Sequence, residues 1–543
     1  MNTIRNLSCR SGGEAVLRNL LLNDCTVCFT NPGTSEMHFC AALDDVPEMR
    51  SILVLFEGVA SGACLGYGIM ADKPSACLMH LSGGYGNGYA NLHNAKRSAV
   101  PVIVICGDHA TDHQYDQHLQ GDITQIASGV SGTVVHNLDE MALVRDLNDC
   151  IRGAYRAPGN VATLILPANA SWNPNPPLPV KITNLPKEII CTSDKVMLGM
   201  KILKEAMSMG MGSEVLLLHG LKTARKDGLI QSWRIAEATK CGNMLPTFNG
   251  KVEYGWDIPR VNTIPYFAEQ QVQLLSKYKI ILLVNAKHPA GFFGYPEEAN
   301  KPGWVLPDGC QVVELASVHD DGIQYLTDLA NALNAPVYMP SSRAPPVTKT
   351  FNPNDNLNPK SIGIIMSKYL PEEFVMVDEG NTMGGPIKAS GQFYNRCHYD
   401  QVALVGGAIG QGLPVSVGVG VAVPDKKVIN LQADGSAMYT IQSLWTMARE
   451  KLDVCVVICD NGVYGILAFE HSRMTGKQPG NKAMEMFDLS MNGENIDFVQ
   501  LAKGMGVDGA KCFTDGEFEK AFQHAMSTKG PYLIQAVARR PKM

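Results

Sequence analysis

The chain has 543 residues and a formal net charge of −6 at pH 7, and 45% of its residues are hydrophobic. This length exceeds what one hydrophobic core holds and predicts about three domains of ordinary size. The charge balance lacks the basic stripe of a nucleic-acid-binding protein, and no apolar run approaches the roughly 20 residues that a membrane-spanning helix needs. We therefore expect a globular protein whose partners include neither nucleic acid nor a membrane.

The N-terminus lacks the apolar core of a secretory signal. Arg5 and Arg10 precede the first acidic residue, Glu14, so an organelle presequence stays open beside the cytoplasmic location that we favour. The 15 cysteines lie mostly inside apolar runs, which is typical of reduced, buried thiols in a cytosolic protein. Cys25 and Cys28 form a CxxC motif without a second pair at zinc-like spacing, so we expect strand residues there rather than a metal site.

Two proline-rich stretches, residues 167–188 and 334–360, interrupt the chain. Because proline continues neither a helix nor a central strand, both stretches predict surface linkers between domains. We expect an N-terminal domain in residues 1–175, a central domain in 188–338 and a C-terminal domain in 357–543.

Each segment alternates short apolar runs with longer helical stretches. The runs include "VPVIVICGD" in the first segment, "YKIILLVNA" in the second and "DVCVVICDNG" in the third. Strands without polar alternation are buried on both faces, which indicates a parallel sheet covered by helices. The predicted fold class is therefore α/β, with three doubly wound parallel-sheet domains whose ligands bind at the carboxyl ends of the strands.

In the first segment, Glu57 follows the apolar run "SILVLF" and is flanked by apolar residues and glycine. A desolvated carboxylate in this place suits proton transfer, although a glutamate in the first turn of a helix also stabilises the helix dipole without any chemistry. His80 ends the run "ACLM" and opens a glycine-rich stretch. It is either a proton shuttle or a satisfied core histidine.

The polar loop 107–122 contains three further histidines, His109, His113 and His118. The spacing of His109 and His113 fits two metal ligands on one helical turn. A polar loop that lines a substrate pocket is the alternative that we favour.

In the third segment, Asp434 and Asn461 each follow a buried apolar run and precede a glycine. The stretch 436–452 between them has the apolar spacing of a crossover helix, so we expect both residues at one edge of one sheet. Carboxylate and amide oxygens suit Mg²⁺ or Ca²⁺ and leave room for phosphate oxygens, and a helix that starts near Ser436 presents its N-terminus to an anion. Asp-Gly and Asn-Gly are also ordinary turn dipeptides, so this pattern alone does not decide between a site and two turns.

The pair "ADG" and "DNG" resembles the thiamine diphosphate motif, in which a GDG is followed by paired asparagines. Ala433 stands where the first glycine is usual and Asp460 where the first asparagine is usual, so an additional carboxylate alters the charge near the metal ligands. The resemblance extends over essentially the whole chain and is to the benzoylformate decarboxylase and acetolactate synthase branch of the thiamine diphosphate enzymes. Its other motifs are "NPGTSE" (31–36), "HLSGGYGNGYANLHNA" (80–95), "GGAIGQGLPVSVGVG" (406–420), "NGVYGILAF" (461–469) and "GPYLIQAVA" (530–538).

The resemblance implies two cofactors, thiamine diphosphate and Mg²⁺. The metal would be bound by Asp434, Asn461 and the backbone carbonyl of Val463. The other residues that the resemblance places around the cofactor are Gly33, Asn87, Asn381, Thr382, Gly407, Ile409, Gly435, Ser436, Tyr464 and Gly465.

Catalytic roles follow from the same resemblance. Glu57 would hydrogen-bond the pyrimidine ring of the cofactor, Gly407 would accept a hydrogen bond from its amino group, and Ile409 would support its bent shape. Thr34 and His80 would handle the substrate carboxylate and its protons.

Part of the substrate pocket differs from the resembled decarboxylases, which contribute a second histidine from the central domain. In "HPAGFFGYP", His288 comes several residues early and Tyr295 falls nearer to that place. The candidates for an apolar pocket wall are Phe292, Phe293, Tyr295, Ile466 and Phe469.

The function implied is decarboxylation or carboligation of a 2-oxo acid, of the benzoylformate decarboxylase kind, through a C2 ylide and an enamine. An acetolactate synthase-type carboligase is the alternative, and a non-catalytic regulator with the same fold is a more remote one. No dinucleotide fingerprint follows a strand of the central segment, so FAD is not expected. In the resembled family the two halves of the site meet across a subunit interface, which implies a homodimer with shared active sites, paired into a homotetramer.

Overall fold

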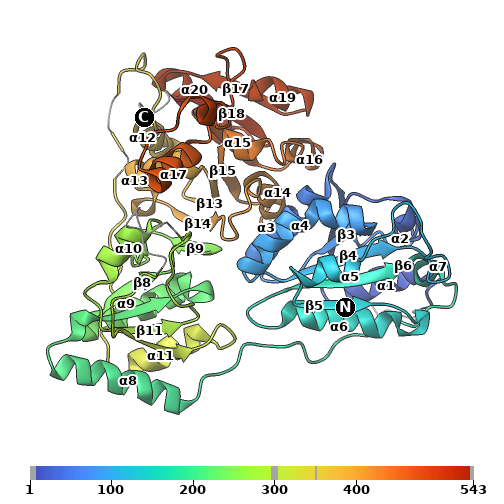
Figure 1. Ribbon diagram of the computed structural model, residues 1–543, viewed down its shortest axis with the longest axis horizontal. Helices are drawn as coiled ribbons and strands as arrows, with labels where there is room; N and C mark the ends of the chain where they lie inside the picture. Colours follow the sequence, from blue (N-terminus) through green and yellow to red (C-terminus); the bar gives the residue numbers. More distant parts are fainter. Residues whose placement is uncertain (1–7, 295–303, 346, 349–350, 539–543) are drawn as a thin grey trace.

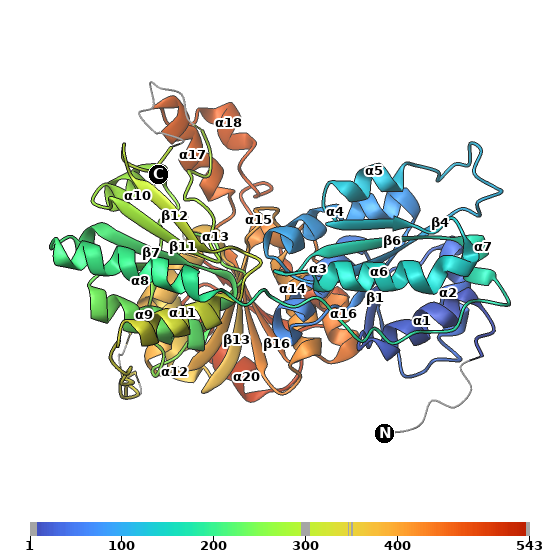
Figure 2. The ribbon, with the colours of Figure 1, turned by 90° about the horizontal axis from the view of Figure 1, so that it is seen from below.

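The computed structural model describes residues 8–294, 304–345, 347–348 and 351–538, which fold into three α/β units (Figure 1). Each unit is built around one sheet of mainly parallel strands with helices against it. The predicted fold class is confirmed. A long extended segment leads from the first unit to the second, and the third unit lies against both (Figures 1 and 2).

The first unit is a six-stranded sheet between two layers of helices. Its strands and helices are β1 (Val27–Thr30), β2 (Arg50–Leu53), β3 (Ala76–His80), β4 (Val102–Asp108), β5 (Thr133–His136), β6 (Val161–Pro167), α1 (Gly12–Leu22), α2 (Met37–Ala42), α3 (Glu57–Ala71), α4 (Leu81–Arg97), α5 (Ile123–Ser128), α6 (Leu143–Tyr155) and α7 (Ala168–Trp172). The strand order is β2-β1-β3-β4-β6-β5 with every pairing parallel. All residues of β4 and β6 are buried, which explains why these runs lack polar alternation.

The central unit has a smaller parallel sheet. Its strands and helices are β7 (Val215–His219), β8 (Gly242–Leu245), β10 (Asn262–Thr263), β11 (Ile280–Val284), β12 (Gln311–Ala316), α8 (Ser193–Ser208), α9 (Lys226–Thr239), α10 (Ala268–Leu275) and α11 (Gly322–Ala332). The strand order is β10-β8-β7-β11-β12.

The third unit has the largest sheet. Its strands and helices are β13 (Glu373–Glu379), β14 (His398–Ala403), β15 (Lys427–Ala433), β16 (Val454–Asp460), β17 (Asp508–Cys512), β18 (Tyr532–Val537), α12 (Pro359–Tyr369), α13 (Asn381–Gly391), α14 (Gly412–Ala422), α15 (Asp434–Ala437), α16 (Ser443–Glu450), α17 (Gly465–Thr475), α18 (Asn481–Glu485), α19 (Phe498–Gly504) and α20 (Asp515–Ser527).

One strand of the central segment belongs to the third sheet. The strand β9 (Lys251–Tyr254) pairs antiparallel with β14, with Tyr254 opposite Tyr399, and the order becomes β17-β18-β16-β15-β13-β14-β9. It covers what would otherwise be an open sheet edge. The segment that the sequence assigned to the central domain therefore contributes to two sheets.

The first and third sheets have the same topology. In each sheet, the first strand of the unit lies between the second and the third. The chain therefore adds its second strand on one side of the first strand and its later strands on the other side. These switch points, between β1 and β3 and between β13 and β15, are where ligands bind in open α/β sheets.

The first and third units meet along α3 and α14, which cross at close range (Figures 1 and 2). A Cβ built on Gly66 would overlap the backbone of Val415, and one built on Gly418 would overlap the carbonyl oxygen of Ala63. Both helices lie in one hydrophobic cluster that joins the two sheets. Glycine thus sets the distance between the units, because no larger residue fits at these two crossings.

The cysteines behave as expected from their apolar surroundings. All 15 are free thiols, and Cys28 lies in β1 with Cys25 just before that strand. Among the described residues, no group of three or more His, Cys, Asp or Glu side chains could hold a metal. Within the same part of the chain, no helix is both long and apolar enough to cross a bilayer.

The helix crossing generates a prediction. Gly418→Ala should destabilise the fold by about 1–3 kcal/mol, because the new methyl group is forced into the backbone of α3. Gly420→Ala in the same helix is the matched control, since its Cβ would come no closer than 3.4 Å to Leu452. That variant should be neutral or gain about 0.5–1 kcal/mol from helix propensity. Urea unfolding midpoints check both values, and equal stabilities of the two variants would contradict the crossing.

Candidate active site

Asp434 and Asn461 lie in contact at the carboxyl ends of β15 and β16. The Asp434 carboxylate, 4% exposed, accepts hydrogen bonds from the backbone amides of Gly435 (2.8 Å), Asn461 (3.1 Å) and Gly462 (2.7 Å). The two strands are parallel neighbours, so both turns reach the same edge of the sheet. The structure thus brings together the two residues that the sequence singled out as metal ligands, through the Asp434 carboxylate and the backbone amide of Asn461.

Asp460 is held by protein donors on both carboxylate oxygens. Gln535 Nε2 donates at 2.7 Å, Asn495 Nδ2 at 2.8 Å and the backbone amide of Gly462 at 3.1 Å. Gln535 comes from β18, and Asn495 comes from the loop before α19. The residue that departs from the expected motif therefore ties the end of β16 to two neighbouring segments.

Two buried carboxylates side by side repel each other. Burial, together with the smaller effect of the Asp460 charge, raises the pKa of Asp434 to about 7 despite the lowering effect of the three amide donors. Burial also raises the pKa of Asp460, again against its donors. This arrangement favours either a proton or a cation at Asp434.

Residues from three turns gather around this pair. Asn381 Nδ2 donates to Ser436 Oγ at 3.0 Å, which joins the start of α13 to the start of α15. A Cβ built on Gly465 would lie 3.6 Å from Thr382 Oγ1 and 3.7 Å from Asn461 Nδ2. The turns after β13, β15 and β16 therefore converge as the sequence predicted.

The turn after β16 is packed closely. The ring of Tyr464 lies over Gly435, where a Cβ would overlap it. The carbonyl of Val463 accepts a hydrogen bond from the amide of Gly465 at 2.8 Å, and Val463 is 3% exposed. A carbonyl oxygen has a second lone pair, so this one can still contribute to a metal site.

The loop that contains Gly407 and Ile409 is fastened to the first unit. Asn94 Nδ2 on α4 donates to the carbonyl of Ala408 at 2.8 Å, and His93 Nε2 lies 3.1 Å from the carbonyl of Gly406. Gly407 adopts φ +77°, a conformation that favours glycine, and it is exposed. Ile409 is half-buried.

Glu57 is the first residue of α3 and is 7% exposed. Its carboxylate accepts a hydrogen bond from Asn87 Nδ2 at 3.1 Å, and Gly84 lies beside its other oxygen. Both partners are on α4. In the described part of the chain, the hydrogen bonds of this carboxylate stay within the first unit, so Glu57 and Asp434 occupy separate halves of the candidate site.

His80 ends β3 and is paired with an acid that the sequence analysis did not single out. Its Nδ1 lies 2.9 Å from Glu36 Oε2, which also accepts the amide of Gly33 at 2.8 Å. Glu36 is 2% exposed, and burial raises its pKa against the lowering effect of His80. Thr34 is exposed and opens the short 3-10 helix that carries Glu36. The only sequence signal for Glu36 is its place in the quoted motif "NPGTSE".

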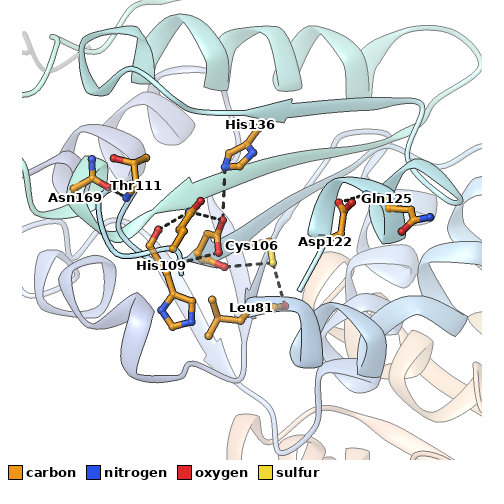
Figure 3. Close-up of polar contacts among 11 residues, drawn as sticks. Leu81, Cys106, His109, Thr111, Asp122, Gln125, His136 and Asn169 are labelled. Carbon is orange, nitrogen blue, oxygen red and sulfur yellow. Dashed lines mark hydrogen bonds and ion pairs between the residues drawn. The ribbon is translucent and has the colours of Figure 1, made fainter. Parts of the chain in front are cut away.

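The histidine loop after β4 is organised by Asp108. This side chain accepts the amide of His109 at 2.8 Å and Gln114 Nε2 at 3.1 Å, and its Oδ2 lies 3.6 Å from His136 Nε2 (Figure 3). The His109 ring points away from His136 in this view and lies edge-on to His113, with 6.3 Å between ring centroids. Among the described residues, no group of three or more His, Cys, Asp or Glu side chains could hold a metal here, and the lining of a substrate pocket by this loop stays a prediction.

Aromatic side chains form a cluster beside Gly407. A Cβ built on Gly407 would lie 3.4 Å from Phe292. The Phe292 ring lies 5.3 Å from that of Tyr266 and 4.5 Å from that of Phe293, and Phe267 lies 5.2 Å from Phe469 of α17. We call the following residues the aromatic cluster: Phe248, Tyr266, Phe267, Phe292, Phe293 and Phe469.

His288, Ile466 and Tyr295 are not members of the aromatic cluster. His288 is engaged elsewhere, with Nδ1 2.9 Å from the carbonyl of Pro289 and its ring 4.9 Å from that of Trp304. Ile466 lies in the first turn of α17. Tyr295 lies outside the described residues.

Comparison with known proteins identifies two matching family models. The model of the thiamine pyrophosphate enzyme N-terminal TPP-binding domain matches residues 10–128, and that of the C-terminal TPP-binding domain matches residues 387–536. These spans contain the Glu57 half and the Asp434 half of the candidate site.

Similar proteins extend this match along the chain. Mycobacterium tuberculosis IlvX, assigned by name to the acetolactate synthase large subunits, is 40% identical over 97% of this chain and 99% of its own length. Pseudomonas aeruginosa benzoylformate decarboxylase is 26% identical over 94% of this chain and 95% of its own. The structure of the Rhodococcus jostii thiamine diphosphate-dependent 4-hydroxybenzoylformate decarboxylase has a TM-score of 0.81 at 22% identity and covers 98% of this chain and 100% of its own. The chain therefore belongs to the thiamine pyrophosphate enzyme family.

Proposed function

We propose that this protein is a thiamine diphosphate- and Mg²⁺-dependent enzyme that decarboxylates a 2-oxo acid or transfers the resulting fragment to an acceptor. The observation that carries the proposal is the contact between Asp434 and Asn461 at the carboxyl ends of β15 and β16. A buried carboxylate, an amide oxygen and a backbone carbonyl are the hard donors that Mg²⁺ prefers. The paired charges of Asp434 and Asp460 also favour a cation there.

The chain's own residues would divide the work between the two halves. When bound, thiamine diphosphate would supply a carbon nucleophile for the keto carbon and would take up the electron pair left behind as CO₂ departs. Asp434, Asn461 and the carbonyl of Val463 would hold the magnesium ion. The residues that would hold the diphosphate are Asn381, Thr382, Gly435, Ser436, Tyr464 and Gly465.

Two acids in the first unit have distinct roles in the proposal. Glu57 is sheltered from water, so its carboxylate can hold a proton at a ring nitrogen of the cofactor with little competition from solvent. Glu36 occupies His80 Nδ1, which leaves Nε2 as the nitrogen that exchanges a proton with the substrate. Thr34 and Gly33 would border the substrate beside His80.

Decarboxylation is the activity that we favour. The His80–Glu36 pair provides a proton donor for the decarboxylated fragment, which is the step that releases an aldehyde. The 40% identity to IlvX supports acetolactate synthase-type carboligation as a second candidate. A non-catalytic regulator is disfavoured because Glu57 and Asp434 are both present and buried.

The aromatic cluster supports a bulky apolar substrate. Phe292, Phe293 and Phe469 are 42%, 49% and 50% exposed within one chain, so their faces are available to a ligand. Phe292 lies next to Gly407, which would contact the cofactor. We therefore propose that the acyl group of the 2-oxo acid is aromatic or branched.

We also propose that the active form is a homodimer with shared active sites, paired into a tetramer. The separation of Glu57 and Asp434 into different units supports this arrangement. The exposed Gly407, Met438 (41% exposed) and Tyr439 (53% exposed) lie on the third unit's side of the site and are available to a second copy.

A substrate panel tests the activity. With thiamine diphosphate and Mg²⁺, the enzyme should release CO₂ from benzoylformate or a branched 2-oxo acid more efficiently than from pyruvate. Phe292→Ala should raise KM for the bulky substrate about tenfold and leave pyruvate nearly unaffected. Glu57→Gln is the control, since it should still bind the cofactor but turn over far more slowly.

Two results of this panel would each contradict one part of the proposal, the first the preference for decarboxylation and the second the role of Glu57. Preference for pyruvate with acetolactate as product would establish the synthase alternative, and wild-type turnover by Glu57→Gln would exclude the role assigned to Glu57.

The raised pKa of Asp434 generates a pH prediction. Its folded pKa of about 7 exceeds its ordinary 3.8, so the folded chain binds this proton more tightly than the unfolded chain. In cation-free protein this group therefore favours folding below about pH 4, and its contribution is lost as pH rises to about 7. Mg²⁺ must displace the proton, so its affinity should fall about tenfold per pH unit below pH 7.

Infrared difference spectroscopy checks this assignment. The cation-free protein should show a carboxylic acid band that titrates near pH 7 and is absent in Asp434→Asn. Asp460→Asn removes the neighbouring charge and should move the titration to lower pH. A band that persists in Asp434→Asn would assign the proton elsewhere.

A further inference from the structure

Glu379, the last residue of β13, is a buried acid that the proposed chemistry does not use. It is 2% exposed. Its carboxylate accepts hydrogen bonds from the amides of Gly410 at 2.7 Å and Gly412 at 2.6 Å and from Gln432 Nε2 at 2.8 Å. Burying a carboxylate is costly unless it is fully hydrogen-bonded. Here the donors are backbone and side-chain amides, so the charge is satisfied by oriented dipoles.

The carboxylate fixes the turn that follows Ile409. Gly410 adopts φ +92°, and its carbonyl accepts a hydrogen bond from Thr440 Oγ1 at 2.8 Å. The amide on one side of this glycine is therefore held by Glu379 and the carbonyl on the other side by Thr440. The direction in which the chain enters Gly410 sets where the Ile409 side chain points.

The same carboxylate caps α14. Gly412 is the first residue of this helix, and a negative charge on its free amide also complements the helix dipole. α14 is the helix that crosses α3, so Glu379 connects the Gly407–Ile409 loop to the contact between the two units.

Glu379 also joins the other turns of the site. It immediately precedes Gly380 and Asn381. Its hydrogen-bond partner Gln432 lies on β15, two residues before Asp434. A Cβ built on Gly412 would be 3.0 Å from Glu379 Cβ, so the loop, β13 and β15 are packed without space for rearrangement.

We propose that Glu379 is a positioning residue that sets the Gly407–Ile409 loop in the shape needed to receive thiamine diphosphate. The inference rests on the proposed function, because the cofactor is what the loop would receive. The charge is essential to it. The carboxylate accepts at both oxygens, whereas a glutamine has one oxygen and one NH₂ group. All three partners, the amides of Gly410 and Gly412 and Gln432 Nε2, are donors, so the NH₂ group of a glutamine would face at least one donor without an acceptor.

Glu379→Gln tests the proposal by isothermal titration of thiamine diphosphate with Mg²⁺. The variant should bind the cofactor about tenfold or more weakly, as expected when a hydrogen-bonded charge is lost. Asp515→Asn is the matched control, since Asp515 is equally buried in the third unit but lies on α20. It should bind like wild type. Wild-type affinity in Glu379→Gln would overturn the proposal.

A second variant separates positioning from general stability. Ile409→Ala removes the side chain that the loop presents, so its effect and that of Glu379→Gln should be less than additive in the double variant. The near-ultraviolet circular dichroism of the bound cofactor should change in both single variants and not in Asp515→Asn. Strictly additive losses would mean that Glu379 acts only on folding and would overturn the positioning role.

Hydrogen exchange of the cofactor-free wild-type protein provides a test that needs no variant. The amides of Gly410 and Gly412 should be protected because they donate to Glu379. Free exchange of these amides would overturn the positioning role of Glu379 even if Glu379→Gln fails to fold. If wild type binds no thiamine diphosphate at all, both the proposed function and this inference fail. If wild type binds thiamine diphosphate and Glu379→Gln binds it with the same affinity, the proposed function survives and this inference fails.

Discussion

The parallel register of β13, β15 and β16 determines where the third unit's half of the site lies. Glu379 is paired with Gln432, and Ala433 is paired with Cys459, so the three strands end at one level. Their turns are therefore brought together by the backbone hydrogen bonds of the sheet, before any side chain contributes. A slip of one residue would turn every side chain of the strand to the opposite face and remove Asp434 from the site.

Buried acids held by amide donors recur around this edge. Asp434, Asp460 and Glu379 each accept hydrogen bonds from backbone amides that follow the strands, and Asp434 and Asp460 share the amide of Gly462. Such charges are expensive to bury, so the turns must hold their amides in fixed directions. The same donors that satisfy the acids also fix the backbone that would receive the cofactor. The first unit also contains a buried acid held by a backbone amide, because Glu36 accepts a hydrogen bond from the amide of Gly33 and pairs with His80.

Much of this could be predicted from the sequence because the relevant signals are local. Apolar runs without polar alternation indicated parallel sheets, and the resemblance to the thiamine diphosphate motif assigned the polar residues at their ends to a site. Other features depend on distant neighbours. β9 is a strand because β14 offers it an edge far along the chain. Glu36 contacts His80 because β1 and β3 are adjacent strands. In the sequence, Glu379 is one of several acids that precede a glycine, and its role depends on the loop 406–412, which the fold packs against it. His288 comes several residues early for the place of the second histidine, and in the structure its ring packs on Trp304.

The central claim is that Asp434 and Asn461 hold a magnesium ion through which this family member binds thiamine diphosphate. Isothermal titration of thiamine diphosphate into cofactor-free protein tests it most directly, with Mg²⁺ present, with a chelator present, and with Asp434→Ala in place of wild type. We expect saturable binding only for wild type with Mg²⁺. Equal binding in the chelator, or by Asp434→Ala with Mg²⁺, would contradict the account.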